Sequence, residues 1–196
     1  MIVKSISYLT VVGLFMAVLT ACESVDNFNP FSDTKSGPPM CPTIKFLKDA
    51  DEITVYKSGA GKDLRDIIFE AELTGFKGEC EYVGNNGIHT KVVLTLQLGL
   101  DITRGPAEKT RSVKLSYFVA IPDFFPKPEG KVFFNRVVIF PQERNSITLL
   151  DEAIKIVIPL NKNRRGPQTK ILVGFELTKS QLEFNRQRIR NRGLRK

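Results

Sequence analysis

The chain has 196 residues, of which 42% are hydrophobic and 26% are charged, and its formal net charge is +8. This length provides one domain with a hydrophobic core, and the composition is neither that of a disordered chain nor that of collagen. The single histidine, His89, argues against zinc enzymes and histidine-based catalysis, while the basic excess allows nucleic acid, anionic lipid or an acidic protein as partner.

The N-terminus predicts export. Lys4 precedes an apolar run from about Ile6 to Leu19, which is shorter than a transmembrane helix and is followed by small residues, as in a signal peptide. The stretch Leu19-Thr20-Ala21-Cys22 resembles the lipobox of bacterial lipoproteins. This resemblance implies that residues 1–21 are removed, and that Cys22 receives diacylglycerol on sulfur and an acyl chain on its new amino group. Several acyl chains anchor a protein stably, whereas one chain holds it only weakly.

The same resemblance implies a location. Lipoproteins kept at the inner membrane commonly carry Asp after the lipidated cysteine, so Glu23 favours the outer membrane, with the protein facing the periplasm. The alternatives are an ordinary signal peptide cut elsewhere and an uncleaved anchor. Residues 22–40 are polar, contain Pro30, Pro38 and Pro39, and show no period, so they predict a lipidated tether.

The three cysteines are explained by this assignment. If lipid occupies Cys22, then Cys41 and Cys80 remain, and in an oxidising compartment we expect them to form a disulfide. Two buried free thiols are the alternative. Two distant cysteines and one histidine lack the spacing of metal ligands, so we expect no metal site, and no other cofactor is indicated.

Residues 41–178 predict an all-β domain. Apolar and polar residues alternate repeatedly, most clearly at the even positions from Val92 to Ile102, which is typical of antiparallel strands that bury one face. Turn residues separate the segments, and Gly84-Asn85-Asn86-Gly87 predicts a hairpin. The expected strands are 52–57, 66–75, 78–83, 88–102, 111–121, 132–140, 147–159 and 170–178.

A helical period is absent from this region, which excludes alternating βαβ units. We therefore expect an antiparallel β-sandwich of about eight strands, immunoglobulin-like or related, with a barrel as the alternative. The chain has no Trp, so the buried Trp of antibody domains is missing. The bridge between Cys41 and Cys80 is expected at the N-terminal edge of the sandwich, rather than between the centres of the two sheets.

Motifs for catalysis are weak, and we expect a protein that is not an enzyme. Residues 58–63 suggest a phosphate-binding loop, but Tyr56 and Asp63 stand where that motif requires Gly and Ser or Thr. His89 is expected to be solvated or at a sheet edge, and no Gly-x-Ser-x-Gly elbow accompanies it. Carboxylates spaced two apart, as in Glu70 and Glu72, are typical of the polar face of a strand, although such a pair can also form a site.

The proline-rich loop 122–130 is a candidate contact surface. Phe124 and Phe125 lie next to each other in it, and exposed aromatic side chains on loops often dominate protein interfaces. The alternative is that both rings fold back over the end of the sandwich.

The basic charge is concentrated at the C-terminus. Ser180 and Glu183 match a capping box and predict a helix over 181–191. Residues 179–196 contain seven basic residues and one acid, against 21 basic and 20 acidic residues in 22–178. The candidate contacts for an anionic partner are Arg186, Arg188, Arg190, Arg192, Arg195 and Lys196.

That partner is expected to be anionic lipid, an acidic cell-wall component or an envelope protein, and export excludes nucleic acid. A merely solvated end is the alternative. The segment Gly174-Phe175-Glu176-Leu177-Thr178 and the Asn- and Arg-rich stretch after it resemble the ending of uncharacterised proteobacterial outer-membrane lipoproteins, which implies no particular activity.

We therefore expect a lipid-anchored lipoprotein of the cell envelope that acts as a non-enzymatic binding or assembly module. The alternative is a periplasmic β-sandwich that binds or hydrolyses a small ligand through an unrecognised carboxylate site.

Overall fold

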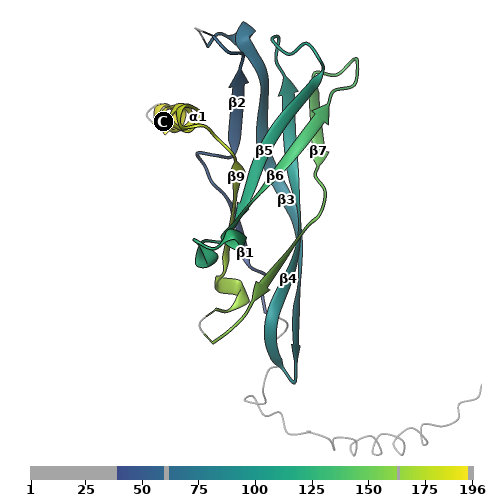
Figure 1. Ribbon diagram of the computed structural model, residues 1–196, viewed down its shortest axis with the longest axis vertical. Helices are drawn as coiled ribbons and strands as arrows, with labels where there is room; N and C mark the ends of the chain where they lie inside the picture. Colours follow the sequence, from purple (N-terminus) through teal and green to yellow (C-terminus); the bar gives the residue numbers. More distant parts are fainter. Residues whose placement is uncertain (1–38, 60–61, 163, 194–196) are drawn as a thin grey trace, which may run out of the picture. The chain divides into compact units, whose positions relative to one another are not determined.

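The computed structural model of the protein describes residues 39–59, 62–162 and 164–193, and these fold into two β-sheets followed by an α-helix (Figure 1). The expected signal peptide, Cys22 and most of the expected tether lie outside the described residues. Within the described part, no helix is long and apolar enough to cross a membrane.

Nine strands form the two sheets of the described chain. They are β1 (Thr43–Phe46), β2 (Glu52–Tyr56), β3 (Ile67–Asn85), β4 (Ile88–Arg104), β5 (Ser112–Ala120), β6 (Lys131–Ile139), β7 (Ser146–Leu150), β8 (Ile154–Pro159) and β9 (Lys170–Phe175). The first sheet has the order β1-β9-β5-β6. In the second sheet the order is β2-β3-β4, and β7 and β8 both pair with β4. Neighbouring strands are antiparallel, except that β1 and β9 are parallel.

This architecture confirms the predicted antiparallel β-sandwich with a short C-terminal helix. Over the described residues the two sheets share no strand, so the barrel alternative is wrong. The core consists of the inward-facing residues of both sheets. Val92, Leu94, Leu96, Leu98, Leu100 and Ile102 of β4 are fully buried, as the alternating pattern predicts. They face a layer that includes Tyr117, Ile171, Val173 and Phe175 from the first sheet.

Three strand boundaries differ from the prediction. The segments 66–75 and 78–83 form one strand, β3, because a register shift between Leu73 and Gly75 accommodates the irregular stretch without ending the strand. The segment 147–159 is divided into β7 and β8, and residues 151–153 separate them. Strand β1 has no counterpart among the predicted strands, because four residues that pair with the distant β9 leave little local pattern.

The hairpin and the disulfide both form as expected. Between β3 and β4, Asn86 and Gly87 adopt consecutive positive φ angles of 51° and 76°, the conformation of a tight hairpin turn. Cys41 and Cys80 are bonded, with their Cα atoms 5.7 Å apart. The bond joins the segment before β1 to β3, so it links the edges of the two sheets at the N-terminal side of the domain.

The C-terminal helix α1 (Lys179–Gly193) begins two residues earlier than predicted. Its first turn is capped by Thr178 and Gln181, so the prediction of Ser180 and Glu183 as the capping box is wrong. The Gln181 amide donates to the Thr178 hydroxyl at 3.3 Å, and the Thr178 amide donates to the Gln181 side-chain oxygen at 2.8 Å. The Thr178 carbonyl accepts the first helical hydrogen bond from the Leu182 amide, which makes Thr178 the N-cap.

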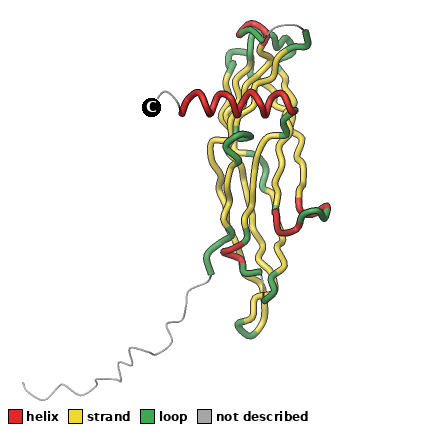
Figure 2. Tube along the Cα trace, turned by 90° about the vertical axis from the view of Figure 1, so that its left-hand side faces the viewer, coloured by secondary structure: helices red, strands yellow, loops and turns green. Residues whose placement is uncertain are grey.

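Helix α1 lies across the direction of the strands and packs against β2 (Figure 2). Asn185 is buried in this contact, and its amide nitrogen donates to the carbonyls of Asp49 at 3.1 Å and Glu52 at 2.7 Å. The helix is therefore part of the folded domain over its described length, rather than a free tail.

Candidate functional site

A groove of about 780 Å³ lies between β6 and β8, along the side of the sandwich where both sheets end. Apolar side chains from both sheets line it, among them Val119, Val132, Phe134, Ile154 and Ile156. Charges of both signs stand around them, namely Lys127, Arg136, Lys155 and Arg164 with Asp123, Glu129 and Glu152. A concave apolar surface with a few polar groups is the usual form of a binding site.

The strands on either side of this groove have unpaired outer edges. Within the described chain, β6 pairs only with β5, and β8 pairs only with β4. Strand β6 also exposes large apolar side chains: Phe133, Val137 (61% exposed) and Ile139 (73% exposed). Soluble proteins commonly shield such edges with charges, prolines or bulges, and nine continuously paired residues of β6 carry few of these devices. Over the described residues, the outer edge of β6 is thus unpaired and lies beside exposed apolar side chains.

A buried polar cluster, of which Arg136 lines the groove, joins the two sheets. Asp151 follows β7 and is 7% exposed. The single N–H at Nε of Arg136 in β6 is shared between the two carboxylate oxygens of Asp151, at 2.8 and 2.7 Å, and the hydroxyl of Tyr117 in β5 donates to the carboxylate at 2.5 Å. The Asp151 backbone carbonyl accepts from Gln97 of β4 at 3.3 Å. One residue therefore connects β4 with both β5 and β6.

The electrostatics of this cluster favour a structural role. Burial, together with the hydrogen bond to Asp151, holds the pKa of Tyr117 well above its usual range, so Tyr117 remains a protonated donor. The hydrogen bond to Asp151 raises the pKa of Arg136. The Tyr117 and Phe134 rings stack 5.3 Å apart, and the guanidinium lies within 6.0 Å of both ring centres. Because the Asp151 carboxylate already accepts from two side chains, it supports the groove wall rather than offering a free base.

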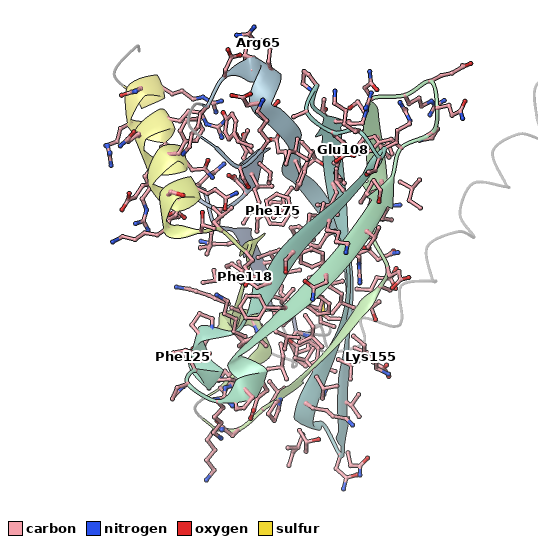
Figure 3. The ribbon with its side chains drawn as sticks, turned by 45° about the horizontal axis from the view of Figure 1, so that its top comes forward. Arg65, Glu108, Phe118, Phe125, Lys155 and Phe175 are labelled. Carbon is pink, nitrogen blue, oxygen red and sulfur yellow. A yellow bond between two sulfur atoms is a disulfide. The ribbon has the colours of Figure 1, made fainter. Side chains whose placement is uncertain are left out.

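The two aromatic residues of the loop before β6 have different environments. Phe124 belongs to a short 3₁₀ turn (Pro122–Phe124), lines the groove and lies 4.4 Å below the guanidinium of Arg164. Phe125 is exposed on the same loop (Figure 3). The close fit of this loop requires Gly130, where a Cβ atom would stand 2.8 Å from the Phe125 amide nitrogen. The structure therefore separates the predicted pair into one groove residue and one exposed residue.

The candidate basic contacts of α1 are partly neutralised within the domain. Arg186 pairs with Asp49 at 2.8 Å, Arg188 forms a short contact with Glu52, and Arg192 lies 3.6 Å from Glu52. In the described residues Arg190 is exposed without an ion-pair partner. Arg195 and Lys196 lie outside the described residues.

Glu52, the acidic partner of Arg188 and Arg192, belongs to a row of carboxylates on the outer face of the second sheet. Glu52 of β2 lies beside Glu72 of β3, which lies beside Asp101 of β4. Arg188 and Glu70 line the same shallow depression. The row explains the position of the basic helix, because an uncompensated line of carboxylates would repel itself.

The remaining candidates from the sequence are His89 and possible metal ligands. The exposed His89 ring lies 5.2 Å from that of Tyr82. Among the described residues, no three His, Cys, Asp or Glu side chains are arranged to hold a metal ion.

Comparisons of the chain with protein families, with curated proteins and with solved structures find no match.

Sequence reasoning did not identify the cluster of Tyr117, Arg136 and Asp151. One local signal was present, since Asp151 and Glu152 interrupt an otherwise alternating segment at 147–159. The partners of Asp151 come from strands that are distant in the sequence, so only the fold brings them together.

Proposed function

We propose that the protein is a lipid-anchored, outer-membrane lipoprotein facing the periplasm, and that it acts as a non-enzymatic binding module. Its binding site is the groove between β6 and β8, and the occupant is an extended segment of another envelope protein. The segment adds a strand to β6 and places alternate side chains in the groove. The observation that carries this proposal is the coincidence of an apolar groove with an unshielded edge strand.

The chemistry of the edge supports an extended peptide as occupant. Backbone groups along β6 supply hydrogen bonds for any sequence, and pockets for alternate side chains supply specificity. Lys155 and Glu129, of opposite charge, both line the groove, which suits a mainly apolar segment with isolated charges. The basic end of the chain, with Arg190, Arg195 and Lys196, remains a candidate second contact for an acidic envelope protein or cell-wall component.

The edge of β6 is tested by a photoreactive phenylalanine derivative at position 137, introduced into the protein in cells that export it. We expect a crosslink to one partner, located by mass spectrometry within an extended stretch of alternating apolar residues. A synthetic peptide of that stretch then binds the wild-type protein. Val137→Lys weakens the measured affinity at least about tenfold, since it places a charge beside the added strand, on the exposed face of β6 that is turned away from the groove.

The matched control is Leu64, which is 77% exposed in the short turn Leu64–Asp66 away from the groove. The photoreactive group at position 64 is expected to give no such crosslink, and Leu64→Lys leaves peptide affinity unchanged. Both lysine variants retain the free energy of unfolding within about 0.5 kcal/mol, because the replaced side chains are exposed. A crosslink at position 137 only to a second copy of the chain contradicts the partner segment and indicates a dimer.

The anchor is tested separately at Cys22. Metabolic labelling with a fatty acid is expected to mark the wild-type protein, and Cys22→Ser abolishes both the label and recovery with the membrane fraction. Glu23→Asp serves as the control: it retains the label and shifts the protein toward the inner-membrane fraction if the sorting rule applies. Labelling that survives Cys22→Ser contradicts lipidation at this residue.

A small-ligand or hydrolytic function is the second candidate, since Asp123, Glu129 and Glu152 all line the groove. It predicts that substitution of these carboxylates, and not Val137→Lys, removes activity or ligand binding. The peptide and crosslinking experiments therefore distinguish the two functions.

A further inference from the structure

The described chain begins beside two turns at one end of the sandwich. Pro39 lines a cavity of about 530 Å³ together with Tyr82 and His89 of the β3–β4 hairpin and residues 160, 161 and 164–168 of the β8–β9 connection. The Tyr82 hydroxyl donates to the Met40 carbonyl at 2.7 Å, and the disulfide follows immediately at Cys41. The position of residues 39–41 is thus determined by the domain, and this is where the expected tether joins it.

The three segments that build this end carry charge of one sign. Residues 39–46, 82–91 and 159–170 contain no Asp or Glu, and they contain Lys45, Lys91, Lys162, Arg164, Arg165 and Lys170. None of these six forms an ion pair within the described part of the chain. The net charge of residues 22–178 is near zero, yet acidic and basic residues are separated in space. Acids such as Asp49 and Glu52 lie under α1.

The same segments carry two large exposed apolar side chains. Met40 is 79% exposed, and Ile88, which follows the hairpin turn, is 71% exposed. We call Met40, Ile88, Lys162, Arg164 and Arg165 the tether-end surface. Figure 1 shows the β3–β4 turn at the lower end of the sandwich and α1 near the other end, against β2. The tether-end surface is therefore distinct from the basic helix.

We propose that the tether-end surface lies against an anionic lipid bilayer, with Met40 and Ile88 at the acyl boundary and the basic side chains at headgroup phosphates. The choice of a bilayer as the occupant rests on the proposed function, in which Cys22 carries the lipid anchor. Sixteen residues separate Cys22 from Pro39 in the sequence, so a lipidated Cys22 keeps this end near the bilayer at high effective concentration. Basic residues close to an anionic surface and exposed apolar side chains then act together.

The test uses a chain that starts at residue 22 and carries Cys22→Ser, which retains every described residue and removes the lipid. Its partition is measured by sedimentation with vesicles of phosphatidylglycerol and phosphatidylethanolamine, and with vesicles of phosphatidylcholine alone. We expect binding to the anionic vesicles only, weakening as salt is raised. Lys162→Glu/Arg165→Glu lowers the partition coefficient at least about tenfold, since each basic contact gives roughly a fivefold gain.

The matched control is Lys179→Glu/Arg190→Glu, which makes the same change in net charge on exposed residues of α1. It is expected to change partition by less than about twofold. Equal losses in the two variants, or loss in the helix variant alone, would overturn the proposal, as would equal binding to phosphatidylcholine. Because the chain is not lipidated, these outcomes are independent of the Cys22 labelling experiment that tests the anchor.

Discussion

Replacing both Cys41 and Cys80 with alanine is expected to lower the free energy of unfolding by about 4 kcal/mol. The bond closes a sequence separation of 39 residues, and in the chain-entropy account its loss frees that loop in the unfolded state. Strand β1 is only four residues long and, among the strands that the structure describes, pairs only with β9, so the disulfide also holds the start of the domain against the second sheet. Urea denaturation of the chain that starts at residue 22 with Cys22→Ser measures the effect.

Reduction provides the control for this prediction. The Cys22→Ser protein in excess reductant should denature at the midpoint of the double alanine variant, and the reductant should not move the midpoint of that variant. A loss below about 1 kcal/mol would show that the described packing around β1 holds without the bond. The vesicle partition measurement can also be repeated with the double alanine variant, because Met40 precedes Cys41 and loses its fixed position when the bond is absent.

Asp151→Ala is expected to cost about 3 kcal/mol of unfolding free energy. The substitution leaves the buried Tyr117 hydroxyl without its acceptor and leaves the partly buried Arg136 without its buried counter-ion. Arg136 retains some solvent contact, so the lower end of the range for a broken buried pair applies. Denaturant unfolding, monitored by Tyr fluorescence, measures the cost.

Two neighbouring variants show whether the buried cluster is responsible. Tyr117→Phe removes one donor from Asp151 and is expected to cost about 1 kcal/mol. Glu152→Ala removes a carboxylate whose side chain is 86% exposed and 3.7 Å from Arg136, and the expected cost is below about 0.5 kcal/mol. If Asp151→Ala costs no more than Glu152→Ala, the cluster does not hold the sheets together.

This cluster also connects stability with the proposed binding function. Arg136 lines the groove while its side chain is fixed by Asp151 and by the rings of Tyr117 and Phe134. A conservative Arg136→Lys variant retains the charge and loses the planar contact with the carboxylate. The groove is thus framed by a polar group that cannot easily rotate away, which suits recognition of an extended segment without a large rearrangement.

Local patterns were sufficient wherever one strand and one face decided the outcome. The apolar stripe of β4 predicts a buried face, and its even positions from Val92 to Ile102 are buried. The Asn86-Gly87 turn follows from the need for two positive φ angles in succession. The predicted capping box was wrong because two such pairs overlap at the start of the helix, Thr178 with Gln181 and Ser180 with Glu183. Only tertiary contacts of α1 select between them.

The distribution of charge depends on the fold in a similar way. Along the chain, the basic residues of 159–170 are balanced by acids elsewhere, and an average over residues 22–178 is near neutral. Folding brings Arg164 and Arg165 beside the start of the described chain, while Asp49 and Glu52 face the arginines of α1. Electrostatic attraction acts over distances in space, so the order of charges in the sequence does not show which surfaces are basic.

The sequence by itself indicated the all-β class, the bond between Cys41 and Cys80 and the presence of a C-terminal helix, because alternation and Ser/Thr-x-x-Glu/Gln spacing act over short spans, although it did not select the cap that forms. Only the tertiary structure decided that Asp151 meets Tyr117 and Arg136, that β6 and β8 border an open groove, and that the tether-end surface is basic. Each of these depends on which strands become neighbours. Strand order arises from burial of the whole core at once, which no single segment encodes.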